Sequence, residues 1–190
     1  SGPELGNLKM KALVLEQPYQ LALNTIDVPH AEEGQVLIRT THTGICGSDA
    51  KIYEGKMPAK YPIVMGHEIV GEIIDGNTGS STRPGTRVLV DPVLYCGSCF
   101  HCNRDDTHLC QDGTLMGREI NGGFADYCVV GNSQIHPLPD KLDSKTGAVV
   151  QVLTTVLHAQ NKGGISARDT VVVLGLGVTG LMHIQLAKAH

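Results

Sequence analysis

The feature that most constrains this chain is a cluster of four cysteines with short, fixed spacing. Residues 95–110 read Y-C-G-S-C-F-H-C-N-R-D-D-T-H-L-C, which is the spacing C-x2-C-x2-C-x7-C. Four thiolates satisfy a tetrahedral zinc ion, and two-residue gaps let neighbouring thiolates reach the same metal. Because sulfur fills every position of such a site and leaves none for a substrate, we expect a structural zinc that folds a lobe over residues 95–112. Its expected ligands are Cys96, Cys99, Cys102 and Cys110.

Two disulfides, free thiols and an iron–sulfur cluster are the alternatives to zinc in this cysteine cluster. A bacterial ferredoxin run has a shorter last gap and a proline after its final cysteine, which this cluster lacks. Residues 1–9 lack the basic region and apolar core of a secretion signal, so we expect a reducing, cytoplasmic compartment. There, clustered cysteines bind metal more often than they form disulfides. We also expect residues 1–9 to be a non-native leader ahead of Met10.

Composition excludes several classes of protein. With 41% hydrophobic and 18% charged residues, the 190-residue chain is globular and not disordered. No apolar run approaches the roughly 18 residues that span a membrane, so we expect no membrane partner. The net charge of −4 argues against nucleic acid, whose binders carry a basic face. The 23 glycines and 4% aromatic residues favour a turn-rich β fold over a helical bundle.

Short apolar runs between glycine and proline residues predict a β-rich domain. Within 36–40, alternate side chains belong to two different faces, which is the period of a half-buried strand. Five or more such strands, separated by turn residues, are typical of an antiparallel barrel or sandwich. The expected strands cover residues 11–15, 36–40, 68–75, 87–90, 125–130 and 134–136.

The pattern changes near residue 140, where helical periods replace short strands. Asp143 or Ser144 can cap a helix that continues through Val149. The further elements expected are a helix over 152–160, a buried parallel strand over 169–174 and a helix over 178–190. A single strand followed by a single helix cannot form a parallel sheet, so we expect the chain to be part of a longer enzyme and inactive by itself. We therefore divide the chain into a β-rich catalytic domain, 10–160, and the first β–α unit of a Rossmann (α/β) domain, 161–190.

A glycine-rich turn joins the last predicted strand to the last predicted helix. Residues 175–180 read G-L-G-V-T-G and fit the dinucleotide pattern G-x-G-x-x-G in its usual strand–turn–helix context. In that pattern Gly175 permits the turn, Gly177 lets the backbone approach a pyrophosphate, and Gly180 lets the helix pack on the strand. A glycine-rich turn without a ligand is the alternative. The acidic residue that would read the ribose lies about 20 residues further on, so NAD and NADP both stay open.

A second set of possible metal ligands lies nearer the N-terminus. Cys46 falls in G-I-C-G-S-D at 44–49, and His67 and Glu68 fall in G-H-E at 66–68. A thiolate, an imidazole and a carboxylate are all zinc ligands. Each is a weak signal alone, but together with the cysteine cluster and the glycine-rich turn the set is specific.

These motifs together resemble the zinc-dependent medium-chain dehydrogenase/reductase family, which includes alcohol, polyol and threonine dehydrogenases. The resemblance extends from Met10 to the end of the chain and reaches about half of a family member of ordinary length. It implies a GroES-like barrel that carries the zinc sites, followed by a nucleotide-binding domain. The matching segments are 44–49, 66–68, P-G-T-R-V at 84–88, the cysteine cluster, G-G-F-A-D-Y at 122–127 and 175–180.

The resemblance also implies a role for each matching residue. Cys46 and His67 would hold a catalytic zinc, with Glu68 as a third or exchangeable ligand. Ser48 would hand on the proton of the alcohol, and Thr155 would contact the nicotinamide ring. The residues implied in cofactor binding are Thr155, Gly175, Gly177, Val178 and Gly180.

Two positions depart from the family pattern. Polyol dehydrogenases carry a glutamate, and other branches a cysteine, where this chain has Gln151. Because an amide oxygen is a neutral and weaker zinc ligand, we expect either Gln151 or water to complete the catalytic site. Alcohol dehydrogenases often have a histidine three residues after the serine, and this chain has Lys51 there.

We therefore expect a zinc-dependent oxidoreductase that transfers hydride between an alcohol and NAD or NADP. A secondary alcohol, a polyol or a sugar-like alcohol would be the substrate, and the whole protein would form a homo-oligomer. The alternative is a zinc-binding structural or interaction module without catalysis. A zinc-free reductase of the same superfamily is a third possibility, but such reductases lack the cysteine lobe.

Overall fold

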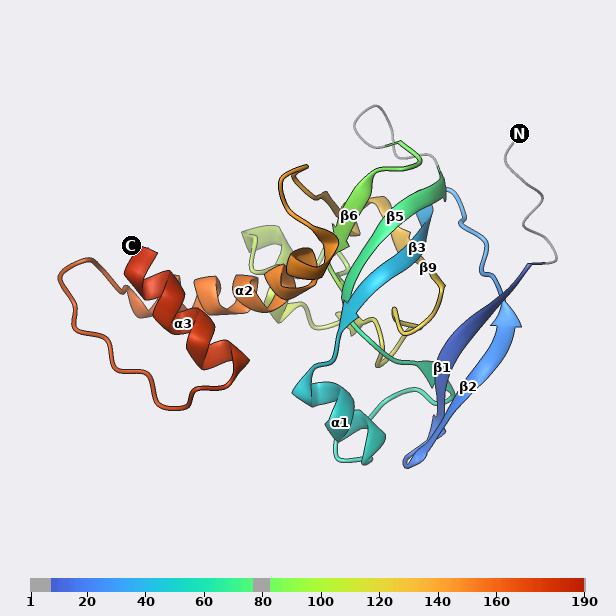
Figure 1. Cartoon of the computed structure of the whole chain (residues 1–190), viewed down its shortest axis with the longest axis horizontal. Coiled ribbons are helices and arrows are strands. Elements are labelled where there is room, and N and C mark those ends of the chain that lie inside the picture. The colour runs from blue at the N-terminus through green and yellow to red at the C-terminus, as the bar shows by residue number, and fades with distance from the viewer. Residues whose placement is uncertain (1–7, 77–82, 190) are drawn as a thin grey trace. The chain divides into compact units, whose positions relative to one another are not determined.

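Two units make up the chain in a computed structural model, which describes residues 8–76 and 83–189 (Figure 1). The first unit runs to Ala148 and the second begins at Val149. Residues 1–7 of the expected leader lie outside the described residues, and the first strand begins at Lys9. The division into domains at residue 160 stays a prediction. Within the described ranges, no helix is long and apolar enough to cross a membrane.

A five-stranded antiparallel sheet forms the centre of the first unit. Its strand order is β10-β6-β5-β3-β9, and β6, β5 and β3 lie side by side in Figure 1. These strands confirm five of the predicted segments within a few residues of their bounds. They are β3 (Gln35–Gly44), β5 (Glu68–Gly76), β6 (Arg87–Val90), β9 (Tyr127–Gly131) and β10 (Ile135–Pro137).

One hydrophobic cluster covers one face of this sheet. Alternate side chains along β3 and β5 point inward, so that Val36 and Ile38 pack with Ile69 and Ile73 at 0% exposure. Burial of one such side chain stabilises the fold by roughly 1.5–3 kcal/mol. The same apolar cluster also contains Val88, Val90, Met116, Cys128 and Val130.

A second sheet has the order β2-β1-β4 and contains the predicted strand at 11–15. The strand β2 was not predicted. It is an edge strand that is exposed along most of both faces, so polar and apolar residues do not alternate along it. The strands of this sheet are β1 (Lys9–Gln17), β2 (Gln20–Asp27) and β4 (Ile63–Val64). A short hairpin of β7 (Val93–Leu94) with β8 (Thr114–Leu115) flanks the cysteine cluster.

The helix predicted after residue 140 is present and is longer than expected. Asp143 caps it, since the backbone N–H of Thr146 donates to Asp143 Oδ1 at 2.9 Å. The two predicted helical stretches form one continuous helix, α2 (Ser144–Gly163). Sequence patterns missed α1 (Gly47–Tyr53), because seven residues are too few to show a helical period. The 3₁₀ turns are η2 (Cys102–Arg104), η3 (Thr107–Leu109) and η4 (Asn132–Gln134).

In the second unit, the predicted helix at the end of the chain is confirmed as α3 (Val178–Ala189). The prediction of a buried parallel strand over 169–174 is wrong for this structure. A strand requires ladder hydrogen bonds to a neighbour, and none of the described residues pairs with this segment. Its side chains are exposed, Val172 by 78% and Leu174 by 94%. The Rossmann β–α unit is therefore not confirmed.

Candidate metal centres

Pairing of β3 with β5 brings the first set of predicted ligands together. The two strands run antiparallel, with Gly44 at the end of β3 opposite Glu68 at the start of β5. Cys46 follows β3 by two residues and His67 immediately precedes β5. Because both segments meet at one end of the sheet, residues that are distant in sequence become neighbours.

The side chains of Cys46, His67 and Glu68 converge on one point. One ligand atom of each lies within 4.8 Å of the others. His67 and Glu68 are buried, and Cys46 is half-buried. Soft sulfur, imidazole nitrogen and carboxylate oxygen form a donor set that suits zinc. The residues that the sequence predicted therefore fit a metal ion of this kind.

Asp49 is a member of this site that was not predicted from the sequence. Its Oδ2 accepts a hydrogen bond of 2.8 Å from the backbone N–H of Cys46, at the start of α1. Its Oδ1 lies 3.4 Å from Nδ1 of His67, and the carboxylate is 2% exposed. The sequence C-G-S-D could have indicated Asp49, because an acidic residue three positions after the N-cap residue of a helix completes a capping box.

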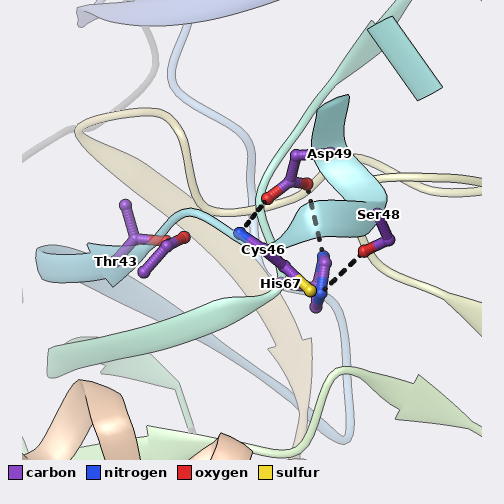
Figure 2. A network of polar contacts seen from close by, with 6 residues as sticks. Thr43, Cys46, Ser48, Asp49 and His67 are labelled. Atoms are coloured by element: carbon purple, nitrogen blue, oxygen red, sulfur yellow. Dashed lines mark hydrogen bonds and ion pairs between the residues drawn. The ribbon is translucent and has the colours of Figure 1, made fainter. Parts of the chain in front are cut away.

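Asp49 and Ser48 each lie beside a different ring nitrogen of His67 (Figure 2). Ser48 Oγ lies 3.4 Å from Nε2, while Asp49 lies next to Nδ1. A carboxylate on one ring nitrogen fixes the tautomer and leaves the other nitrogen free to bind a metal. The predicted Ser48 is therefore inside the site, whereas Lys51 is exposed on the same helix.

In the metal-free site, the neighbouring groups raise the pKa of His67 and lower the pKa of Cys46. Burial lowers the pKa of His67, but the Asp49 carboxylate and Cys46 outweigh it and raise the pKa to about 9. Burial raises the pKa of Cys46, yet hydrogen bonds with Ser48 and the charge of His67 hold it below its usual value. Burial raises the pKa of Glu68 above its usual value. A metal cation bound at this point would supply the positive charge that the imidazolium proton supplies in the metal-free site.

The four cysteines of the second set also converge. Their Sγ atoms are separated by 3.5 to 4.0 Å along four of the edges of the cluster. A tetrahedral zinc with Zn–S bonds of about 2.3 Å places its sulfurs about 3.8 Å apart. None of the six cysteines, all of which lie in the described ranges, is joined in a disulfide. The backbone N–H groups of Ser98 and Cys99 lower the pKa of Cys96 to about 6.

The remaining predicted residues lie in the second unit. Gln151 and Thr155 are in α2, where Thr155 Oγ1 donates to the carbonyl of Val152. Gly175 has φ of 99°, which L side chains rarely adopt, so the turn requires glycine there. A β-carbon at Gly180 would overlap the carbonyl oxygen of Gly175. Gly175 therefore has the turn conformation that was predicted for it, while close packing of Gly180 against a strand stays a prediction. Gly177 faces open space, and Val178 is the first residue of α3.

Removal of the Asp49 charge should lower the pKa of His67 in the metal-free chain. In Asp49→Asn only Cys46 still opposes the effect of burial, so we expect the pKa to fall from about 9 towards its usual value of about 6.5. An NMR titration of the imidazole signals measures this shift. A raised pKa stabilises the fold fully below about pH 6.5, and this stabilisation is lost as the pH rises through about 9. The parent chain should lose stability across that window, and the variant should not.

The matched control is Asp27→Asn, which removes an exposed carboxylate that pairs with Lys9 outside the site. This variant should leave the pKa of His67 unchanged. An unchanged titration of His67 in Asp49→Asn would show that the carboxylate does not control the imidazole.

Comparison with known proteins identifies the family. Over residues 32–140, more than half of its length, the chain matches the family described as Alcohol dehydrogenase GroES-like domain. It is 36% identical over 182 residues to the starvation-sensing protein RspB of Escherichia coli K12. It is also 36% identical over 185 residues to a sorbitol dehydrogenase of Halalkalibacterium halodurans. These alignments cover 94% and 95% of this chain but 53% and 54% of the two relatives. The chain thus spans about half the length of the curated relatives it matches.

Solved structures show the same architecture. A zinc-binding dehydrogenase of Sinorhizobium meliloti 1021, bound to NADP, superposes with a TM-score of 0.92 at 33% identity, covering 96% of this chain and 54% of that one. Galactitol-1-phosphate dehydrogenase of Escherichia coli superposes with a TM-score of 0.89 at 29% identity, covering 94% and 52%. The chain therefore belongs to the family of the alcohol dehydrogenase GroES-like domain.

Proposed function

We propose that this chain is the zinc-carrying part of an oxidoreductase that transfers hydride between an alcohol and NAD or NADP. The observation that carries the proposal is the convergence of Cys46, His67 and Glu68 within 4.8 Å, beside Ser48. A structural or interaction module, the alternative function, needs only the four-cysteine lobe. A catalytic metal requires a donor set in which protein ligands leave one coordination position open, and the four-cysteine lobe has none.

The names of the relatives support the class of substrate. They include a sorbitol dehydrogenase and a galactitol-1-phosphate dehydrogenase, whose names specify alcohols with several hydroxyl groups. A D-arabinitol dehydrogenase of Uromyces fabae is also 32% identical over 183 residues. We therefore assign the chain a polyol or a related secondary alcohol as substrate.

Each residue of the centre would have a separate task. Cys46, His67 and Glu68 would hold a zinc ion, which supplies Lewis-acid polarisation of the alcohol oxygen and so lowers its pKa. Ser48 Oγ would accept the hydroxyl proton of the alcohol and pass its own proton towards solvent. Asp49 would keep Nε2 of His67 unprotonated and correctly oriented. The alcohol thus loses a proton through Ser48 and a hydride to the nicotinamide, and becomes a carbonyl compound.

The second unit would contribute to cofactor binding. The backbone N–H groups at the start of α3, together with Gly175, Gly177, Val178 and Gly180, would face the pyrophosphate of NAD or NADP. Thr155 would lie against the nicotinamide ring. Assembly of the whole protein as a homo-oligomer in the cytoplasm stays a prediction.

Catalysis is testable in a protein of the relatives' length that contains these residues. Such a protein should reduce NAD or NADP in the presence of a secondary alcohol or polyol. His67→Ala removes one of the zinc ligands, so turnover should fall below detection while the lobe zinc stays bound. Reduced nicotinamide, followed by its absorbance, and zinc content measure the two effects. His42→Ala, which changes an exposed histidine of β3, is the control and should retain turnover.

Two results would contradict this assignment. Retained turnover in His67→Ala would show that the chemistry takes place elsewhere. If zinc is bound in the lobe alone and no secondary alcohol or polyol is turned over, the structural module would be favoured.

The lobe is testable in the chain itself. Cys102→Ser removes a buried thiolate of the cluster, so the lobe zinc should be lost and residues 95–112 should unfold locally. Zinc content and amide hydrogen exchange over this segment report the two changes. Cys128→Ala, a buried cysteine outside both clusters, should keep both metals. Zinc content unchanged by Cys102→Ser would contradict a structural zinc at this place.

Gln151 gives a prediction about the catalytic metal. The family resemblance makes it a ligand candidate with a neutral amide, so the zinc of Cys46, His67 and Glu68 should leave before the lobe zinc during dialysis against a chelator. Gln151→Glu adds a negative charge and should slow that loss. Gln185→Glu, on an exposed position of α3, is the control and should not. If Gln151→Glu changes neither metal retention nor the pH dependence of turnover, Gln151 is not a ligand.

A further inference from the structure

Gly44 stands directly across the β3–β5 ladder from Glu68. A β-carbon at Gly44 would overlap Oε2 of Glu68, and it would lie 3.0 Å from Cδ and 3.1 Å from Cβ of the same side chain. Non-bonded carbon atoms are best separated by about 3.5–4.0 Å. The three nearest atoms all belong to Glu68, so its side chain occupies the space that any other residue at position 44 would need.

The backbone does not require glycine at this position. Gly44 is the last residue of β3 and is absent from the glycines with positive φ, such as Gly66 and Gly76. An alanine could adopt its conformation, and glycine in a strand weakens the strand. Glycine is therefore needed at position 44 because the Glu68 side chain fills the space beside it, and not because of the backbone dihedral angles.

We propose that Gly44 is a positioning residue that holds open the space in which the Glu68 carboxylate lies against Cys46 and His67. The inference rests on the proposed function, because it matters only if Glu68 binds a metal there. Glu68 is 7% exposed, so a displaced carboxylate would be buried without its present neighbours, which is unfavourable for a charged group. A side chain at position 44 would thus remove a ligand without altering any ligand residue.

The experiment uses the chain loaded with Zn²⁺, and separately with Co²⁺, as the only probes. Gly44→Ala should weaken metal binding at the Cys46 centre by roughly 10–100-fold in competition with a chelator, the range typical of lost support for a metal ligand. The cobalt absorption spectrum of this centre should change in the same way as in Glu68→Gln. The lobe metal of the same sample serves as the internal reference and should be unaffected.

Two further variants separate positioning from a general effect on the strand. Gly47→Ala is the matched control, since a β-carbon there meets no atom within 4 Å, and it should bind both metals normally. In the Glu68→Gly background the obstructing side chain is gone. Gly44→Ala should then leave the melting temperature unchanged or raise it, whereas in the parent chain it should lower it.

Each outcome separates this inference from the proposed function. If the parent chain binds metal only in the lobe, the proposed function fails and this inference fails with it. If the parent binds both metals and Gly44→Ala binds them equally well, the inference alone is wrong. If Gly44→Ala does not fold, the Gly44→Ala/Glu68→Gly double variant should fold, and its failure to do so would also overturn the proposal.

Discussion

The pairing of β3 with β5 is the constraint on which the candidate metal site of Cys46, His67 and Glu68 depends. The ladder runs from Val36 opposite Gly76 to Gly44 opposite Glu68. Its register is set by packing on both faces of the sheet, since Val36 and Ile38 belong to one apolar cluster and Leu37 to another, and a slip of one residue would exchange them. The apolar residues in the middle of the strands therefore determine where the polar ligands at their ends lie. Packing energy and site geometry are thus coupled through one set of backbone hydrogen bonds.

Asp49 connects the local structure to the chemistry of the centre. One of its oxygens accepts the N–H of Cys46 and so starts α1, while the other lies beside His67. The helix start and the imidazole orientation therefore depend on the same buried carboxylate. Oδ2 is satisfied by the hydrogen bond from Cys46, whereas Oδ1 has no hydrogen-bond partner among the described residues and lies 3.4 Å from Nδ1 of His67, whose charge compensates it when the imidazole is protonated. In this way a helix of seven residues, too short to be stable by itself, is fixed at the centre.

The sequence predicted the buried strands of the first unit well, because core packing makes their side chains alternate. It missed β2 and α1, one exposed along most of its length and the other only seven residues long. It also predicted a strand over 169–174 from β-branched composition alone, although a strand exists only with a hydrogen-bonded neighbour. Among the residues of the centre, Cys46 and His67 were found by ligand chemistry. Asp49 was not, because an acid that supports a ligand has no metal-binding spacing of its own.

The two donor sets differ in how much of the chain must be ordered before they exist. The four cysteines close loops of two, two and seven residues, so the entropy lost on bringing them together is small. The other donor set requires two strands whose contacts are non-local, and such contacts cost more chain entropy to form. The lobe donor set therefore needs less of the chain to be ordered than the β3–β5 set does. The lobe centre is a product of local sequence, and the β3–β5 centre is a product of the finished fold.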